Sequence, residues 1–287
     1  VGLVGESGCG KSTTAKMLLR LLTPDEGTIT FDGQDVHRAR GKQLRALRRN
    51  LQVVPQNPQT SLNPRLTVRQ SIEFNLRAHD FPRSSWGSRV DGLLDRVGLA
   101  KRHGGAFPHE MSGGQLQRAA IARALATEPS LVVCDEAVSA LDKSVQAQVL
   151  NLLVELQREL DVAYLFISHD LAVVEHVSDR VVVMYLGKVV EEGPSHALWS
   201  EPSHPYATTL LSASPGQGRS RIVLEGDPPN PANPPSGCTF HTRCPVAVDR
   251  CKQEIPLLRS VGSSHNSACH LVDIAHPMAM SAEGVSA

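Results

Sequence analysis

The chain has 287 residues, 29 basic and 29 acidic side chains, and six cysteines. This length is enough to bury a core in one large domain, or in a domain with an appendage. The balanced charge gives no electrostatic case for nucleic acid as a partner. Every apolar run is shorter than the ~18 residues that span a bilayer, and the absence of a charged-then-apolar stretch at the start of the chain leads us to expect no secretory leader. We therefore expect a cytosolic protein, and the strand-like start "VGLVG" predicts a chain truncated at its N-terminus.

Residues 1–225 alternate short β-rich runs with longer helical patterns, which predicts an α/β sheet covered by helices. A strand at "VGLVG" leads into a helix expected over 11–22, and Asp32-Gly33 marks a hairpin turn in "GTITFDGQDV". "LVVCDE" and "AYLFISHD" are typical of buried parallel strands. Between these strands a helical insertion is expected in 66–110, from the spacing of Val68, Ile72, Leu76, Val90, Leu93, Leu94 and Val97.

The composition changes after Leu224. The run "EGDPPNPANPPSG" is a proline-rich connector that cannot continue a helix or a central strand. We expect residues 226–275 to form a small extension that contains the cysteine segment. The last residues, 276–287, are expected to be disordered.

"GESGCGKST" fits the phosphate-binding pattern G-x-x-x-x-G-K-[ST] between a strand and a helix. Glycines let backbone N–H groups converge on phosphate oxygens, and the helix N-terminus adds positive charge. Lys11 is expected to reach the β- and γ-phosphates, and the Ser12 hydroxyl to bind Mg²⁺. The expected nucleotide-binding residues are Gly5, Glu6, Ser7, Gly8, Cys9, Gly10, Lys11, Ser12 and Thr13.

Three polar side chains follow the ends of two predicted strands. Asp135 is expected to hold Mg²⁺ through a water molecule, and Glu136 to polarise the attacking water. His169 is expected to contact the γ-phosphate. The alternatives are an acidic helix cap for the pair and a structural histidine, since a lone histidine is more often structural than catalytic. Ligands bind beyond the carboxyl ends of strands in open α/β sheets, which favours the catalytic interpretation.

A second candidate anion site lies in "MSGGQLQR". Ser112 and Gln115 have capping-box spacing, and Gly113-Gly114 leave backbone N–H groups uncovered at a helix start. By spacing alone an ordinary helix cap is the favoured explanation. One nucleotide scarcely needs two helix N-termini on its γ-phosphate, unless the second belongs to a facing subunit.

Four cysteines, Cys238, Cys244, Cys251 and Cys269, gather in the C-terminal segment. Their spacings of five, six and seventeen residues lack the C-x-x-C pairs common in zinc sites and the compact ferredoxin run. A cytosolic setting disfavours a disulfide. On spacing alone, a metal site and unpaired structural thiols both remain open.

The chain resembles ABC-type ATPases. "GESGCGKST", Gln56 in "VVPQNPQTSLNP", "MSGGQLQR", "LVVCDE", "SALD" and "ISHD" occur in that family's order, as Walker A, Q-loop, signature, Walker B, D-loop and H-loop. "QNPQTSLNPRLTV", "HPYATTLLSA" and "LEGDPPNPANPPSGCTFHTRCP" resemble the ATP-binding subunits of bacterial oligopeptide and dipeptide importers, most closely the second ATPase of the unlike pair. The resemblance covers nearly the whole chain.

The resemblance implies a P-loop NTPase fold: a RecA-like core, an antiparallel β-hairpin region and a helical subdomain at about 66–125. It implies an ATP-sandwich dimer in which Ser112, Gly113, Gly114 and Gln115 contact ATP held by the partner. Asp142 would line the dimer interface, and Gln56 would sense Mg²⁺ and nucleotide. The expected catalytic residues are Glu136, His169, Lys11 and Gln56, and the expected Mg²⁺ site comprises Ser12, Gln56 and Asp135.

The implied cofactors are ATP and Mg²⁺, and the implied partners are a second ATPase, two transmembrane permease subunits and, indirectly, an extracytoplasmic peptide-binding protein. The implied location is peripheral, on the cytoplasmic face of the bacterial membrane. Alternatives are the same machinery for nickel chelates or glutathione, a fused two-cassette protein, or a soluble ABC-type ATPase. In some of these importers the C-terminal cysteines hold an iron–sulfur cluster. A [4Fe–4S] cluster on the four cysteines is thus expected, with Zn²⁺ second and His241 or His270 as alternative ligands.

Three departures from the family pattern stand out. The aromatic residue that usually stacks on adenine lies upstream of the P-loop, and we expect it to fall in the N-terminal part that this truncated chain lacks. Ala137 stands where relatives usually carry proline, a change expected to be mild. Lys143 follows "SALD" where relatives often carry a small or acidic residue, and this is expected to alter the dimer interface.

Overall fold

The computed structural model describes residues 1–213, 222–224 and 226–272. These residues form two compact units. The first comprises Val1–Val4 and Gly10–Ser178, and the second comprises Gly5–Cys9 together with the chain from Asp179 onward. The predicted domain division at residue 225 stays a prediction. The expected disordered tail lies outside the described residues.

A parallel sheet organises the first unit. Strands β4 (Leu51–Val54), β5 (Leu131–Asp135), β6 (Ala163–Ile167) and β1 (Gly2–Val4) lie in that order. β5 and β6 are mostly buried, as expected for parallel strands that helices cover. The prediction that "LVVCDE" and "AYLFISHD" form such strands is confirmed. Because the strands are parallel, the residues that follow their carboxyl ends share one edge of the sheet.

Helix α1 (Lys11–Leu18) is shorter than the predicted 11–22. The N–H of Leu21 bonds back to the carbonyl of Lys16 at 2.7 Å, and Arg20 adopts a positive φ of 57°. This 6→1 bond around a left-handed residue is the Schellman helix ending, so the helix stops before Pro24 can act. The predicted hairpin is confirmed as β2 (Thr30–Phe31) and β3 (Gln34–Asp35).

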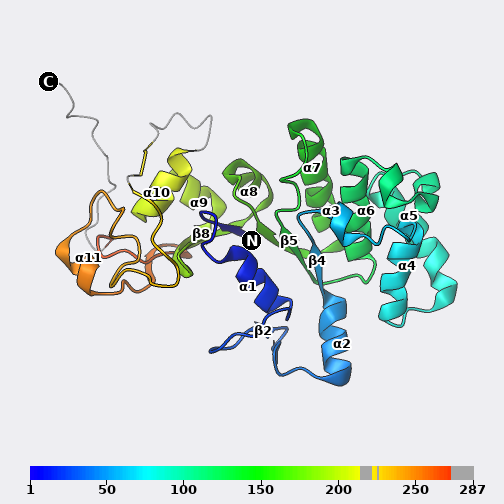
Figure 1. Cartoon of the computed structure of the whole chain (residues 1–287), viewed down its shortest axis with the longest axis horizontal. Helices are drawn as coiled ribbons and strands as arrows, with labels where there is room; N and C mark the ends of the chain where they lie inside the picture. The colour runs from blue at the N-terminus through cyan, green and yellow to red at the C-terminus, as the bar shows by residue number, and fades with distance from the viewer. Residues whose placement is uncertain (214–221, 225, 273–287) are drawn as a thin grey trace. The chain divides into compact units, whose positions relative to one another are not determined.

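Helices α3 (Pro58–Ser61), α4 (Val68–Ala78), α5 (Trp86–Arg96) and α6 (Gly113–Leu125) gather beside one another in the first unit (Figure 1). The 3₁₀ turns η1 (Arg83–Ser85), η2 (Lys101–Gly105) and η3 (Pro108–Glu110) connect them. Every apolar residue used to predict this insertion is buried, and the most exposed of them, Leu93, is only 6% exposed. The helical spacing therefore predicted both the elements and their inward faces.

The remaining helices of the first unit are α2 (Gly41–Asn50), α7 (Lys143–Leu160) and α8 (Leu171–Val177). α7 contributes Val149, Leu153 and Leu156 to the same hydrophobic core as α4 and α6. None of the helices in the described part of the chain combines the length and apolar character needed to cross a membrane.

The second unit contains an antiparallel sheet in which β7 (Arg180–Tyr185), β8 (Lys188–Pro194), β10 (His265–Ser267) and β9 (Arg259–Gly262) follow one another. Its helices are α9 (Ser195–Ser200), α10 (Pro205–Ser212) and α11 (Asp249–Gln253). Residues from the C-terminal extension thus pair directly with β8. The extension is part of this unit's sheet rather than a tethered appendage.

One buried carboxylate joins three segments of the second unit. Glu191, on β8, is fully buried and accepts hydrogen bonds from the backbone N–H groups of Ser203 and His204, at 2.8 and 2.7 Å. Its Oε1 also lies 2.7 Å from Nε2 of His265 on β10. A buried carboxylate is stable only when its acceptor sites are occupied, and here both oxygens have partners.

Candidate nucleotide site

The first half of the P-loop packs within the second unit. Gly5 has a φ of 151°, and a side chain there would place its Cβ 2.2 Å from the backbone oxygen of Met184. The carbonyl of Cys9 accepts the N–H of Gly187 at 2.9 Å, and the Cys9 side chain is buried. Glycine at position 5 is therefore required by the close approach of the β7 backbone at Met184, and Cys9 fills space rather than facing solvent.

The second half of the loop begins α1. Gly10 occupies the N-cap position with a left-handed φ of 107°, and Lys11 is buried while Ser12 and Thr13 are exposed. The Ser12 hydroxyl donates to Oδ1 of Asp135 at 3.2 Å. The structure thus brings together the two side chains that the sequence assigned to Mg²⁺. A hydroxyl and a carboxylate are both oxygen ligands of the kind that Mg²⁺ prefers.

Burial raises the pKa of the Asp135 carboxyl, and the negative charge of Glu136 adds to this, while the hydrogen bond from Ser12 and the charges of Lys16 and Lys11 oppose it. An ionised carboxylate here is therefore costly in the protein alone. A cation placed beside it would remove that cost, so the environment of Asp135 fits a divalent-ion ligand.

Glu136 lies just beyond the end of β5 with a φ of 50°, in the left-handed region that few non-glycine residues adopt. Its backbone N–H donates to the carbonyl of Ile167 at 2.9 Å, which holds this conformation. The alternation of side chains along β5 therefore ends at Asp135, and Glu136 does not continue it. Unusual backbone conformations of this kind cluster at functional sites.

The Glu136 carboxylate joins two further predicted residues. Nε2 of Gln56 donates to Oε2 at 2.7 Å, and Nδ1 of His169 lies 3.2 Å from Oε1. Gln56 follows β4 and His169 follows β6, so the carboxyl ends of three parallel strands meet at this group. The sequence predicted these residues singly, and the structure brings them into contact.

The predicted signature residues lie at the start of α6. Ser112 and Gln115 form a capping box: the Ser112 oxygen accepts the N–H of Gln115 at 3.3 Å, and Oε1 of Gln115 accepts the N–H of Ser112 at 3.0 Å. Ser112 and Gly113 are exposed. A Cβ on Gly114 would meet Val145 at 2.6 Å, whereas one on Gly113 would meet, within the described ranges, only Leu141, at 3.8 Å. Internal packing thus explains Gly114 but not Gly113.

Asp142 caps the neighbouring helix α7 and accepts from the N–H groups of Ser144 and Val145 at 3.1 and 3.0 Å. The side-chain hydrogen bond from Ser144 and these backbone bonds lower the pKa of Asp142. Lys143, the departure noted in the sequence, makes a 2.8 Å ion pair with Asp170 next to His169. The ammonium group of Lys143 therefore has a carboxylate partner within this chain.

Two contacts at the P-loop are not predicted from the sequence. The N–H of Glu6 donates to the hydroxyl of Tyr206 at 2.8 Å, and Nη1 of Arg243 donates to Oε2 of Glu6 at 2.8 Å. Tyr206 belongs to "HPYATTLLSA" and Arg243 to the cysteine segment, both noted only as family resemblances. No local pattern couples residues so distant in the chain.

No disulfide joins the four cysteines of this segment, Cys238, Cys244, Cys251 and Cys269. No group of three or more His, Cys, Asp or Glu side chains in the described structure is arranged to hold a metal ion. His241 and His270, the alternative ligands, lie 2.9 Å from the backbone carbonyls of Cys238 and Glu254. The predicted iron–sulfur cluster thus has no support from side-chain arrangement, and the zinc alternative has none either.

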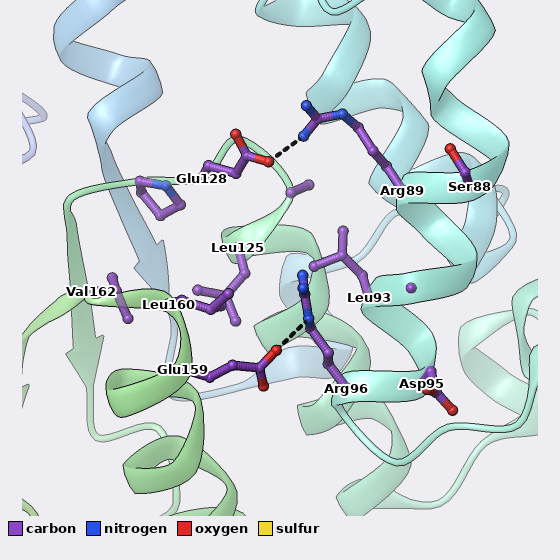
Figure 2. Close-up of a pocket in the computed structure, with 13 residues that line it drawn as sticks. Ser88, Arg89, Leu93, Asp95, Arg96, Leu125, Glu128, Glu159, Leu160 and Val162 are labelled. Carbon is purple, nitrogen blue, oxygen red and sulfur yellow. Dashed lines mark hydrogen bonds and ion pairs between the residues drawn. The ribbon is translucent and has the colours of Figure 1, made fainter.

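A cavity of about 940 Å³ lies elsewhere in the first unit, beside α5 (Figure 2). It is lined by residues preceding β5 and β6, and the ion pairs Arg89–Glu128 and Arg96–Glu159, at 2.6 and 2.8 Å, bridge it. These residues lie at the amino ends of strands whose carboxyl ends carry Asp135 and His169. The cavity is therefore at the opposite edge of the sheet from the nucleotide site.

Comparison with known proteins places this geometry in a family. Residues 1–139 match the family model "ABC transporter", and residues 190–251 match "Oligopeptide/dipeptide transporter, C-terminal region". The chain is 52% identical to the oligopeptide transport ATP-binding protein AppF of Bacillus subtilis, over 94% of this chain and 85% of that protein. The chain belongs to the ABC transporter ATP-binding proteins.

Two further relatives agree. The chain is 51% identical to the probable peptide ABC transporter ATP-binding protein y4tS of Sinorhizobium fredii, over 94% of this chain and 78% of that protein. It is 48% identical to the putative oligopeptide transport ATP-binding protein YkfD of Bacillus subtilis, over 94% of this chain and 84% of that protein.

Solved structures confirm the predicted fold class of this ABC ATPase. CbiO1 of Clostridium perfringens, part of the ABC transporter complex CbiONQ, aligns with a TM-score of 0.64 and 32% identity, over 70% of this chain and 78% of that one. The cassette MJ0796, dimeric and bound to ADP and Pi after hydrolysis, aligns with a TM-score of 0.59 and 28% identity, over 68% of this chain and 84% of that one. The chain is an ATP-binding and ATP-hydrolysing subunit with the P-loop NTPase fold.

Proposed function

We propose that this ABC ATPase powers the import of oligopeptides or dipeptides. The observation that carries the proposal is the match of residues 190–251 to the C-terminal region of oligopeptide/dipeptide transporters. The relatives named above are peptide or oligopeptide transport proteins at about half identity over most of their length. A cassette alone is common to many transport systems, and it is the second match that points to peptides.

The proposed chemistry centres on Glu136. Its carboxylate is the general base that orients and deprotonates the water attacking the γ-phosphate. The contacts of 2.7 Å from Gln56 and 3.2 Å to His169 hold that carboxylate in one position. Lys11 neutralises charge on the β- and γ-phosphates. Fixing the base in this way lowers the entropy cost of reaching the transition state.

Mg²⁺ fits the donor set found at the end of β5. Ser12 and Asp135 would hold the ion, with Gln56 as the third predicted ligand, and the 3.2 Å contact between the Ser12 hydroxyl and the Asp135 carboxylate supports the assignment of the first two. The ion supplies charge neutralisation at the phosphates. The contact between Ser12 and Asp135 is made by these two side chains themselves, so the structure shows them oriented toward each other.

We propose that the capping-box helix start acts on a nucleotide held by a second subunit. Ser112 and Gly113 are exposed, and among the residues that the structure describes only Leu141 lies near the missing Cβ of Gly113. An exposed helix N-terminus with uncovered N–H groups attracts phosphate. The partners would be an unlike second ATPase, two permease subunits and, indirectly, a peptide-binding protein. The location would be peripheral, on the cytoplasmic face of the membrane.

The iron–sulfur cluster belongs to the same proposal. What supports it is the number of thiols: Cys238, Cys244, Cys251 and Cys269 form no disulfide, and four thiolates are the usual ligand set of a [4Fe–4S] cluster. What counts against it is the absence of a metal-holding group among the described residues. Anaerobic purification followed by iron and sulfide analysis decides the matter. A colourless, iron-free protein with full ATPase activity would rule the cluster out.

The transport proposal is tested by uptake of a labelled oligopeptide in a strain lacking this subunit. We expect uptake to be lost, to return with the wild-type chain, and to stay absent with Lys11→Ala. Normal peptide uptake in the deletion strain, with loss of a nickel chelate or glutathione instead, would overturn the substrate class while leaving the ATPase intact.

A further inference from the structure

A single P-loop residue, Glu6, is held by the C-terminal part of the chain at both its backbone and its side chain. Its N–H donates to the Tyr206 hydroxyl at 2.8 Å. Its carboxylate receives two bonds from Arg243, Nη1 to Oε2 at 2.8 Å and Nη2 to Oε1 at 3.3 Å. A two-bond pair between guanidinium and carboxylate fixes orientation as well as distance.

The surroundings make this ion pair unlike the exposed pairs of the molecule. The Arg243 side chain is 8% exposed and that of Glu6 is 29% exposed. Nη1 of Arg243 also lies 3.5 Å from the hydroxyl of Tyr185. Surface pairs contribute little because water screens them, whereas a pair shielded from water is coupled more strongly. Removing either partner is therefore expected to cost more than breaking an exposed pair.

An aromatic cluster supports both contacts. The rings of Tyr185, Tyr206 and Phe240 pack with centroid separations of 4.7, 5.2 and 5.3 Å, and all three side chains are buried. Phe240 also provides the carbonyl that accepts the N–H of Arg243 at 3.0 Å. The arginine is thus placed by a rigid base, so its guanidinium has little freedom to leave Glu6.

The turn that carries Arg243 lies between two cysteines. The N–H of His241 donates to the carbonyl of Cys238 at 3.0 Å, and the N–H of Cys238 donates to the carbonyl of Cys251 at 2.8 Å. Gly237, just before this turn, has a φ of 64°, and a Cβ there would lie 2.4 Å from the Cys251 oxygen. Close packing of the cysteine segment therefore determines where Arg243 stands.

The opposite side of the same loop is equally fixed. The carbonyl of Glu6 accepts the N–H of Cys9 at 3.2 Å, and the carbonyl of Cys9 accepts the N–H of Gly187 at 2.9 Å. The backbone from Glu6 to Cys9 continues directly into Gly10 and Lys11. A shift of Glu6 is therefore transmitted within four residues to the N–H groups that bind phosphate.

We propose that Arg243 is a positioning residue for nucleotide binding: through Glu6 it holds the P-loop in the conformation that accepts phosphate. The C-terminal segment thereby sets the affinity of the cassette for ATP and ADP. This inference depends on the ATP site and not on the transported substrate. Failure of peptide uptake would leave it untouched.

The test compares Arg243→Ala, Arg243→Lys and Glu6→Gln in the full chain, with affinity for a fluorescent ADP, KM and kcat for ATP, and melting temperature as readouts. We expect Arg243→Ala to weaken ADP binding and raise KM about ten-fold, equivalent to about 1.4 kcal/mol, with kcat changed far less. Arg243→Lys is expected to fall between Ala and wild type, because an ammonium retains the charge but not the two-bond geometry.

A matched control is Arg250→Ala, which removes another arginine–carboxylate pair of the same segment, Arg250 with Glu254 at 2.8 Å. We expect it to leave affinity and KM unchanged. If Arg243→Ala does not fold, Glu6→Gln carries the test, since it keeps the side-chain shape and the backbone bond to Tyr206.

The double variant Arg243→Ala/Glu6→Gln distinguishes positioning from general loosening. We expect it to bind ADP no more weakly than the weaker single variant, because both changes break one interaction. Additive losses, or wild-type affinity in a folded Arg243→Ala protein, would overturn the proposal.

Discussion

Glu136 combines a left-handed backbone with a carboxylate that contacts both Gln56 and His169. A glutamate in this conformation is unfavourable by itself, and the bond from its N–H to Ile167 compensates. The consequence is that the side chain projects from the end of the strand toward two polar groups rather than along the sheet face. The carboxylate can therefore be changed chemically without changing the backbone that carries it.

We predict that Glu136→Gln lowers turnover about 10²- to 10⁴-fold, the usual contribution of a general base. The amide keeps the shape and an acceptor for Gln56 but cannot take a proton from water. Nucleotide affinity is expected to stay within a few-fold of wild type, since Glu136 holds no phosphate. Steady-state phosphate release and binding of a fluorescent ATP analogue measure the two effects.

The control for this prediction is Glu155→Gln, the same substitution at an exposed position of α7. It is expected to leave turnover unchanged. Appreciable ATPase activity in Glu136→Gln would show that Glu136 is not the general base. His169 would then be the next candidate for that role.

At the scale of elements, helix α10 starts on a buried histidine. Nδ1 of His204 accepts the N–H of Tyr206 at 3.1 Å, and His204 is 1% exposed beside the Phe240 ring, with centroids 5.8 Å apart. Burial lowers the pKa of His204 to about 4 from an ordinary 6.5. A neutral imidazole is required here because its unprotonated nitrogen serves as the helix cap.

We predict that the free energy of unfolding falls as the pH drops below about 6.5, down to about 4. In that window the unfolded chain binds a proton at His204 and the folded chain does not, so acid favours unfolding. A change in pKa from 6.5 to about 4 amounts to about 3 kcal/mol at its full extent. Urea denaturation at pH 7.5 and pH 5 measures the loss.

His204→Asn isolates this contribution, because asparagine caps helices well and does not titrate. The variant is expected to lose about 2 kcal/mol less than wild type between pH 7.5 and pH 5. His196→Asn, at an exposed position of α9, should retain the wild-type pH dependence. Equal slopes for His204→Asn and wild type would contradict the assignment.

Most helices and strands can be predicted from the sequence, because the patterns that indicate them are local. Alternating strands, helical spacing in 66–110 and the turn at Asp32-Gly33 depend on neighbours in the chain. The early end of α1 was missed because a Schellman ending formed at Arg20, a residue type that gives no such signal. The pair of Glu6 and Arg243 was missed because 237 residues separate its partners. Such contacts depend on tertiary packing, which no local pattern contains.

At the scale of the whole molecule, the exposed start of α6 raises the question of what covers it. Gly114 is explained within the chain, because any side chain there would meet Val145 at 2.6 Å. Gly113 is not, since a Cβ there would make only an ordinary contact with Leu141 at 3.8 Å. Position 113 would tolerate a methyl group inside the subunit, yet it is a glycine. This fits a close approach by ATP that is bound to a second subunit.

We predict that MgATP converts the hydrolysis-deficient Glu136→Gln protein to a dimer, with a second copy of itself or with the unlike ATPase subunit supplied in a parallel sample. Binding without hydrolysis removes the step that reopens the interface, so the closed form accumulates. Adding Gly113→Ala is expected to reduce the dimer fraction several-fold while leaving the melting temperature unchanged. Gly87→Ala, on α5 where a Cβ meets nothing within 4 Å, is the matched control. Size-exclusion chromatography with light scattering measures the dimer fraction. If neither ATP nor Gly113→Ala changes that fraction, the start of α6 does not face a partner's nucleotide.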